Sequence, residues 1–232
     1  MKAFLLAAGL GTRLRPITDE LPKCLVPIQG TPLLQIWLDL FQQHGVTEVL
    51  ANTHYLQERI VEFSSRRTSR TPKLHLVHEG RLLGSAGTLA QNWDFVADEP
   101  NFLVCYADNL TNMHLGKLMD FHQSHSGLIS MALFQSSTPK ECGIVELDDS
   151  NRIVNFEEKP RNPKSNLANG GIYVMRNRVR SYLPDKLPAD IGFDLLPRCS
   201  KEMYGWLGNG LLIDIGSPPA YGLAQRVWNP KV

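Results

Sequence analysis

The sequence lacks the marks of a disulfide-stabilised or membrane-spanning chain. Its 232 residues contain only four scattered cysteines (Cys24, Cys105, Cys142 and Cys199), and no two of them form a C-x-x-C pair. Three of these cysteines lie in or beside apolar runs, which predicts reduced, buried thiols. No segment approaches the ~20 consecutive apolar residues that a membrane span requires. The short N-terminal apolar run is typical of a first strand rather than a signal peptide. We therefore expect a soluble, cytoplasmic protein.

The chain also lacks an excess of charge of either sign. With 24 Lys and Arg against 23 Asp and Glu, its formal net charge is +1, so nothing draws it to nucleic acid or to an anionic membrane. The basic stretch 64–72 carries no interleaved aromatic residues, which favours a solvated connecting loop over nucleic-acid contact. The pair His122 and His125 has a spacing that metal sites use, but on an apparent helix we interpret it as surface decoration.

Alternating strand and helix patterns fill the first half of the chain. Apolar spacing predicts helices over 33–41 and 56–63, and strands over 46–51, 73–77 and 102–106, a βαβα rhythm. Shorter strands are predicted over 128–134, 143–147, 152–156 and 170–175, followed by a strand near 211–215 and a helix over 218–227. The fold class predicted is α/β, with a doubly wound, mostly parallel, Rossmann-like sheet and a smaller mixed or antiparallel part that binds the substrate.

The run from Phe4 to Arg15 has the features of a phosphate-binding loop. A buried strand leads into Gly9 and Gly11, whose backbone N–H groups could approach an anion. Arg13 and Lys23 supply positive charge within reach of this loop. The dinucleotide fingerprint is excluded because Leu14 stands where its third glycine would be, and the P-loop ending Gly-Lys-Ser/Thr is absent. This combination favours a nucleoside triphosphate ligand.

Two acidic residues follow apolar runs that read as strands. Asp108 follows the strand predicted at 102–106, and Asp214 follows Leu211-Leu212-Ile213. Carboxylates at strand ends, facing a triphosphate, are what a Mg²⁺ site needs, because phosphate oxygens and water fill the remaining positions. Further along, Glu158, Lys159 and Asn169 carry groups that suit a sugar phosphate, although the same residues taken alone are typical of a charged surface hairpin.

Together these residues resemble the sugar-phosphate nucleotidyltransferase family, which includes the mannose-1-phosphate guanylyltransferases. The segments 8–16 and 22–27 look like its activated-nucleotide motif, and 83–87 looks like its base-recognition loop, with Glu79 before it. Later landmarks match in order at Asp108, Gly143, 158–160, 169–171 and 214–217. The matches span nearly the whole chain. The chain departs from the common pattern at Ala107 and Ser85, and it resembles the short members without the C-terminal β-helix domain.

The resemblance implies a Mg²⁺-dependent transfer of a nucleotidyl group from an NTP to a sugar 1-phosphate, with release of pyrophosphate. One domain over 1–232 would have a nucleotide-binding half at about 1–127 and a sugar-phosphate-binding half, with the second metal ligand, at about 128–232.

The resemblance also implies catalytic roles for Arg13, Lys23, Asp108 and Asp214, of which Asp108 and Asp214 would hold the metal. The nucleotide would be bound by Ala8, Gly9, Gly11, Thr12, Arg13, Glu79, Gly84 and Ser85, and the sugar phosphate by Gly143, Glu158, Lys159 and Asn169. The implied partners are an NTP and a sugar 1-phosphate, without nucleic acid or membrane, and a homodimer is compatible with the resemblance.

The base and the sugar are less well defined. A carboxylate at Glu79 could accept two hydrogen bonds from guanine but only one from uracil or thymine, which favours GTP. Mannose 1-phosphate is the favoured acceptor. A heptose or N-acetylated sugar 1-phosphate with GTP, UTP or CTP, and glucose 1-phosphate with UTP, stay open. Two other readings are a catalytically silent homologue that binds nucleotide sugars, disfavoured by the presence of all four charged residues, and an NAD-binding domain, disfavoured by Leu14 and Lys23.

Overall fold

The computed structural model describes residues 1–69 and 71–229, and within it the chain divides into two compact units. The first unit comprises residues 1–82, 105–113 and 210–232, and the second comprises 83–104 and 114–209. Both units are therefore discontinuous in sequence, and the strand β6 (Asn101–Tyr106) begins in the second unit and ends in the first. The division of the chain into halves at residue 127 concerns substrate binding and stays a prediction.

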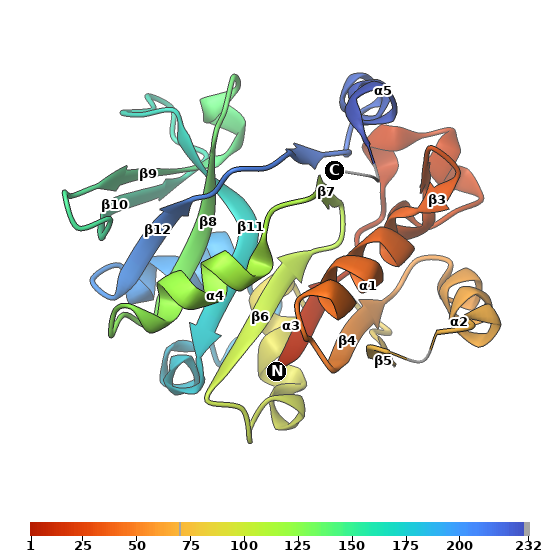
Figure 1. Ribbon diagram of the computed structural model, residues 1–232, viewed down its shortest axis with the longest axis horizontal. Coiled ribbons are helices and arrows are strands. Elements are labelled where there is room, and N and C mark those ends of the chain that lie inside the picture. Colours follow the sequence, from red (N-terminus) through yellow and green to blue (C-terminus); the bar gives the residue numbers. More distant parts are fainter. Residues whose placement is uncertain (70, 230–232) are drawn as a thin grey trace. The chain divides into compact units, whose positions relative to one another are not determined.

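The first unit contains the parallel strands and the helices that connect them. Its elements are β1 (Lys2–Leu6), β2 (Pro27–Ile28), β3 (Thr31–Pro32), α1 (Leu33–Gln43), β4 (Glu48–Thr53), α2 (Gln57–Arg66), β5 (Lys73–His78), β7 (Asn109–Thr111), β13 (Leu212–Asp214) and α5 (Pro218–Val227). Strand β4 pairs in parallel with both β1 and β5 (Figure 1). Crossover helices make such parallel pairing possible, as the βαβ pattern predicts.

Helix α1 shows how the apolar spacing forms this core. Its buried side chains include Leu34, Trp37, Leu38 and Phe41, which recur at helical intervals along one face. Burying each such side chain contributes roughly 1.5–3 kcal/mol to stability. Gly45 follows the helix with a φ of +73°, a conformation that ends helices and that suits glycine.

The second unit carries the antiparallel part of the fold. Its elements are α3 (Ser85–Gln91), most of β6, α4 (Leu115–Gln123), β8 (Ile129–Gln135), β9 (Gly143–Leu147), β10 (Ile153–Glu158), β11 (Leu167–Arg176), the short helical turns η6 (Asn177–Tyr182) and η7 (Ile191–Leu195), and β12 (Met203–Leu207). Strand β11 pairs antiparallel with β8 and β9, β9 pairs antiparallel with β10, and β8 pairs in parallel with β12. Helix α4 packs against β8 and β11 (Figure 1). The predicted α/β class, with parallel strands and a mixed part, is confirmed.

Most element boundaries agree with the sequence patterns, and two expectations were wrong. The loop predicted over 64–72 begins three residues later than expected, because Ser64 to Arg66 form the last turn of α2. Arg66 forms an ion pair there with Glu62, one turn earlier in the helix. Arg70 of the predicted loop lies outside the described residues.

The described cysteines Cys24, Cys105 and Cys199 are buried and free, as expected. No helix among the described residues is long and apolar enough to cross a membrane.

The second wrong expectation concerns the histidine pair, which is not surface decoration. Helix α4 ends at Gln123, so His125 follows the helix while His122 points into the core with 1% exposure. The His122 ring forms hydrogen bonds with Ser130 through Nδ1 and with Asn101 through Nε2. Burial, with smaller contributions from Arg176 and His125, lowers the pKa of His122 from 6.5 to about 3.

This buried histidine predicts a pH-dependent stability. Above pH 6.5 both folded and unfolded chains hold His122 neutral, whereas below it only the unfolded chain takes up the proton. The free energy of unfolding should therefore fall as the pH drops from about 6.5 toward 3, by about 1.4 kcal/mol per pH unit from this residue. Urea denaturation between pH 7 and pH 5 measures the slope, which should be shallower in His122→Gln. A slope changed equally by His78→Gln, which removes an exposed histidine, would contradict this assignment.

Candidate functional site

The loop after β1 is shaped by its glycines and by neighbouring polar groups. Gly11 has a φ of +66° and precedes the short helical turn η1 (Thr12–Leu14), and its carbonyl oxygen accepts hydrogen bonds from Leu14 N and from Thr18 Oγ1. A Cβ atom at Gly11 would lie 3.0 Å from Thr18 Cγ2. The left-handed backbone and the close packing both favour glycine here. Ala8 is buried, whereas Gly9, Thr12 and Arg13 are exposed, so the loop presents both backbone and side chain to solvent.

Beside this loop, one buried ammonium group joins two carboxylates. Lys23 Nζ lies 2.8 Å from Asp108 Oδ2 and 3.0 Å from Asp214 Oδ1. Arg13 Nη2 lies 3.6 Å from the other oxygen, Asp214 Oδ2. The Lys23 side chain is only 10% exposed, while those of Asp108 and Asp214 are 40% and 52% exposed. The first unit therefore brings together all four charged residues that the sequence indicated as catalytic.

Backbone pairing explains why residues so distant in sequence meet. Strand β7, which follows Asp108, pairs antiparallel with β13, and Asp214 lies opposite Asn109 in this pair. Ile215 N donates a hydrogen bond to Asp108 O, which extends the pairing to the two acidic residues. Lys23 reaches them from the turn η3 (Lys23–Leu25), which is buried throughout.

Gly216 belongs to this cluster, although the sequence analysis did not assign it a role. Its N–H donates to Asp214 Oδ1 at 2.8 Å. A Cβ atom at this position would lie 2.7 Å from Arg13 Nη2 and 2.9 Å from Lys23 Nζ. Any larger residue would therefore displace the charged groups. The signal for this role was the glycine two residues after Asp214.

The two carboxylates fit a magnesium ion in donor type and number. Magnesium in proteins is commonly held by one or two carboxylates, with phosphate oxygens and water in the other positions. Both carboxylates lie within hydrogen-bond distance of Lys23 Nζ, which places an oxygen of each near the other. Both side chains stay accessible to solvent. Among the described residues no group of three or more His, Cys, Asp or Glu forms a site that a metal held by protein ligands alone would use.

Glu79 forms a buried polar chain with the end of β1. Its Oε1 accepts a hydrogen bond from Asn52 Nδ2 at 2.9 Å, and Asn52 Oδ1 accepts one from Ala7 N at 2.7 Å. Glu79 and Asn52 are each 4% exposed. Because Ala7 begins the glycine loop, Glu79 helps to fix the loop's entry. Sequence reasoning missed Asn52, which faces the strand-end residue of a neighbouring parallel strand and carries no motif.

In the second unit, Ser85 and the two backbone N–H groups that follow it form hydrogen bonds with the segment around Asp190, and Gly84 packs against the same segment. Ser85 Oγ donates to Asp190 Oδ2 and accepts from Ile191 N, and the backbone N–H groups of residues 86 and 87 donate to Ala189 O. Gly84 has a φ of +77°, and a Cβ atom there would overlap the backbone carbonyl of Ala189. The loop that the sequence indicated for base recognition is therefore rigidly held by residues about 105 positions later.

The residues expected to contact the sugar lie together on adjacent strands of the same unit. Glu158 is opposite Gly143 in the β9–β10 pair, and Asn169 follows Ala168, which is opposite Ile144 in the β9–β11 pair. A Cβ atom at Gly143, or at Gly192 in η7, would lie 2.5 Å from Glu158 Oε2. These glycines make the space in which the carboxyl group sits.

The residues expected to contact the sugar also have unusual charge and backbone conformation. Burial, reinforced by Asp190 and opposed by Lys159, raises the pKa of Glu158 above its usual value. Lys159 has a φ of +50°, and its Nζ lies 6.0 Å above the exposed ring of Phe193. The side-chain amide of Asn169 already forms hydrogen bonds within the fold, since its Nδ2 donates to Tyr173 Oη and its Oδ1 accepts from Gly171 N. Asp190 and Gly192 were missed by sequence analysis, because neither lies in a motif.

Comparison with known proteins gives the family. The family model described as nucleotidyl transferase matches residues 2–227. A UTP–glucose-1-phosphate uridylyltransferase from Synechocystis is 30% identical over 97% of this chain and 63% of its own length. Mannose-1-phosphate guanylyltransferase 1 from Arabidopsis thaliana is 31% identical over 98% of this chain and 64% of its own length. The chain thus spans less than two thirds of these curated relatives.

Solved structures show the same fold at lower identity. A Bacillus anthracis protein crystallised with sucrose has a TM-score of 0.84 at 22% identity, covering 99% of this chain and 96% of that one. HddC from Yersinia pseudotuberculosis, in a complex with GMP-PN, has a TM-score of 0.79 at 22% identity, covering 97% of this chain and 98% of that one. The match of the family model to almost the whole chain, together with these relatives, shows that the protein belongs to the nucleotidyl transferase family.

Proposed function

We propose that this protein transfers a nucleoside monophosphate from an NTP to a sugar 1-phosphate and releases pyrophosphate, with GTP and mannose 1-phosphate as the favoured pair. The observation that supports it best is the bridge from Lys23 Nζ to Asp108 and Asp214, with Arg13 3.6 Å from Asp214 beside a glycine loop. A reaction between two polyanions depends on positioning and on neutralising charge rather than on a covalent nucleophile. This cluster supplies both cations and metal-binding carboxylates.

In the proposed reaction an oxygen of the sugar phosphate attacks the α-phosphorus of the NTP, and the bond to the pyrophosphate oxygen breaks. The loop residues Gly9, Gly11 and Thr12 bind the triphosphate, and Arg13 holds the leaving pyrophosphate. Lys23 neutralises charge near the α-phosphate. Asp108 and Asp214 would hold Mg²⁺, which neutralises phosphate charge when it is bound.

The second unit binds the sugar phosphate in this proposal. Lys159 provides a point charge for the phosphate, and its left-handed backbone fixes where the side chain leaves the strand end. Glu158 and Asn169 offer acceptors and donors for sugar hydroxyl groups, with Gly143 leaving room beside Glu158. Gly84 and Ser85 contribute to binding of the base. The guanine preference draws on Glu79 and on the similarity to the Arabidopsis guanylyltransferase, while the Synechocystis relative acts with UTP and glucose 1-phosphate.

A pyrophosphate-release matrix tests the activity. GTP, UTP, CTP, dTTP and ATP are each paired with hexose, heptose and N-acetylhexosamine 1-phosphates in the presence of Mg²⁺. We expect release only when both substrates are present, with GTP and mannose 1-phosphate the best pair. Asp108→Asn should lower kcat by roughly 10²–10³ because it removes a preorganised charge at the reacting phosphates. Asp120→Asn, which changes an exposed carboxylate on α4, should leave kcat unchanged.

Two outcomes would contradict the proposal. If Asp108→Asn kept near-normal turnover, Asp108 would have no place in the metal site. If no pair released pyrophosphate while the folded protein bound a nucleotide sugar tightly, the protein would be a binding homologue without activity. Circular dichroism of each variant shows whether the fold is retained.

Glu79→Gln tests the base preference separately from the chemistry. Glutamine keeps an oxygen that can accept from Asn52 Nδ2, so the loop should keep its structure. If Glu79 reads guanine, loss of the carboxylate should lower kcat/KM for GTP at least about tenfold, since a hydrogen bond to a charged group contributes roughly 1.5–3 kcal/mol. The value for UTP should change little. Equal losses for both nucleotides would show that Glu79 serves only the loop, and Glu58→Gln, an exposed glutamate on α2, is the control.

Lys159→Ala tests the assignment of the sugar-phosphate site. Loss of its charge should raise the KM for the sugar 1-phosphate at least about tenfold, on the same scale for a charge-assisted contact. The KM for the NTP should stay near the wild-type value. Steady-state kinetics with each substrate varied in turn measures both, and Lys140→Ala, an exposed lysine of the same unit, is the matched control. A selective rise in the KM for the NTP would reverse the two phosphate assignments.

A further inference from the structure

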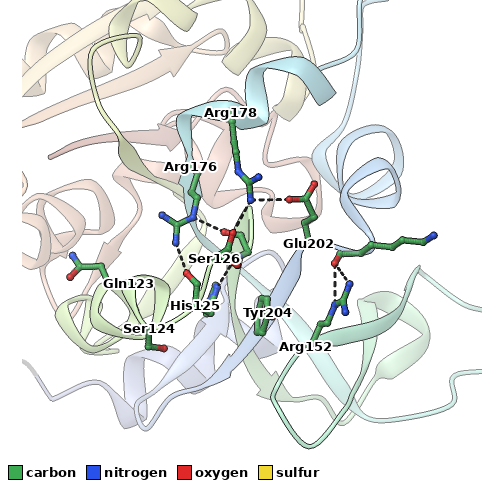
Figure 2. A pocket seen from close by; sticks show the side chains of 11 residues that line it. Gln123, Ser124, His125, Ser126, Arg152, Arg176, Arg178, Glu202 and Tyr204 are labelled. Carbon is green, nitrogen blue, oxygen red and sulfur yellow. Dashed lines mark hydrogen bonds and ion pairs between the residues drawn. The ribbon is translucent and has the colours of Figure 1, made fainter.

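The second unit contains a polar cavity that the proposed function leaves unused. It has a volume of about 830 Å³ and lies where the end of α4, the start of η6, the residue before β10 and the start of β12 meet. Its charged and aromatic lining includes Arg152, Arg176, Arg178, Lys201, Glu202 and Tyr204. Arg176 and Arg178 lie on one side of Tyr204, and Arg152 lies on the other (Figure 2). A volume of this size is ordinary for a small-molecule site.

Backbone carbonyl groups hold the arginine side chains of this cavity in place. Arg176 donates from Nε to Gly127 O at 2.7 Å, and from Nη2 to the carbonyl oxygens of His122 and His125. Arg152 donates from Nε and Nη2 to Lys201 O. These acceptors are neutral, so they orient the guanidinium groups without cancelling their charge. Fixing the side chains in advance removes part of the entropy cost that binding would otherwise carry.

Negative charge in the lining is confined to one carboxylate. Glu202 accepts from Arg178 Nη2 at 2.8 Å and from Tyr182 Oη at 2.6 Å, so its charge is matched by Arg178. Among the described residues the side chains of Arg152, Arg176 and Lys201 form no ion pair with a carboxylate, although the backbone N–H of Arg152 donates to Asp148 Oδ1 at 2.9 Å. The cavity is therefore markedly positive in a chain whose formal net charge is +1.

The rings of His125 and Tyr204 form the aromatic floor of the cavity. Tyr204 stacks on His125 with 3.9 Å between the ring centroids. Burial and the charge of Arg176 lower the pKa of His125 to about 4. His125 also accepts from Gly127 N through Nδ1, which fixes the turn after α4. The imidazole of His125 therefore adds no positive charge near pH 7, and the positive charge of the lining comes from its arginine and lysine side chains.

We propose that this cavity binds the phosphate groups of a small phosphorylated anion. Planar guanidinium groups with unused N–H donors match phosphate oxygens in charge and in hydrogen-bond geometry. Among the described residues, no protein acceptor binds the Nη1 atoms of Arg152, Arg176 and Arg178. None of the residues that line this cavity is among those assigned to catalysis, and the inference does not depend on the proposed function.

Calorimetric titration with inorganic pyrophosphate at low ionic strength tests this proposal. Lys201→Glu reverses a charge in the cavity lining, while Lys186→Glu makes the same change at an exposed position of the same unit outside it. We expect one pyrophosphate site to weaken at least tenfold in Lys201→Glu and less than twofold in Lys186→Glu. Because the glycine loop would also bind pyrophosphate, Arg13→Ala is titrated in parallel and should keep the site that depends on Lys201.

The outcomes separate this proposal from the catalytic one. Absence of any site sensitive to Lys201→Glu, or equal weakening by Lys201→Glu and Lys186→Glu, would overturn the proposal. The same titration with GDP identifies the source of the phosphate groups. Affinity equal to that for pyrophosphate would show recognition of phosphate alone, and tighter binding would add a nucleoside over the Tyr204 floor. Both outcomes of the GDP titration require binding in the cavity. Neither depends on the result of the pyrophosphate-release assay, so the two proposals can fail independently.

Discussion

The ammonium group of Lys23 is the contact on which the charged cluster of the first unit depends. It lies within 3.0 Å of an oxygen from each of Asp108 and Asp214, so the two carboxylates are held close together. Because the two carboxylates carry like charge, they repel each other unless a cation lies between them. Pairing of β7 with β13 fixes the backbones of the two acidic residues near each other. The cation therefore stabilises both the strand pair and the cluster, and loss of Lys23 would leave Asp108 without its cation and Asp214 with Arg13 alone.

In the role proposed for it, the cluster would be arranged for its ligand before binding. The turn that carries Lys23 is buried, Gly216 allows the charged groups to approach, and Arg13 is held near Asp214. Groups fixed in this way need little reorganisation when phosphate charge arrives, which is the main source of catalysis by charge stabilisation. The cluster thus combines a buried supporting turn with carboxylate oxygens that are accessible to solvent.

Local patterns in the sequence indicated many of the helices and strands and the charged residues that the structure brings together, but not the partners of those residues. The apolar spacing of α1 and the strand-end positions of Asp108 and Asp214 are local features, and the structure agrees with them. Asn52, Asp190 and His122 carry no such pattern, because their importance comes from residues far along the chain. His122 was misjudged because it was interpreted together with His125 as one helical pair, whereas His122 lies on the buried face of α4 and His125 lies beyond the helix end.

Residues expected to read the substrate also have structural duties, and this limits what residue type alone reveals about specificity. Ser85 donates to Asp190 and accepts from Ile191, so its hydroxyl is already committed within the fold. Asp190 Oδ1 accepts from Gly192 N, and Gly192 borders Glu158. A change at Ser85 would therefore shift the support of the glutamate proposed to bind the sugar. Within the second unit, base and sugar recognition would share one hydrogen-bonded segment, so a substitution made for one would also affect the other.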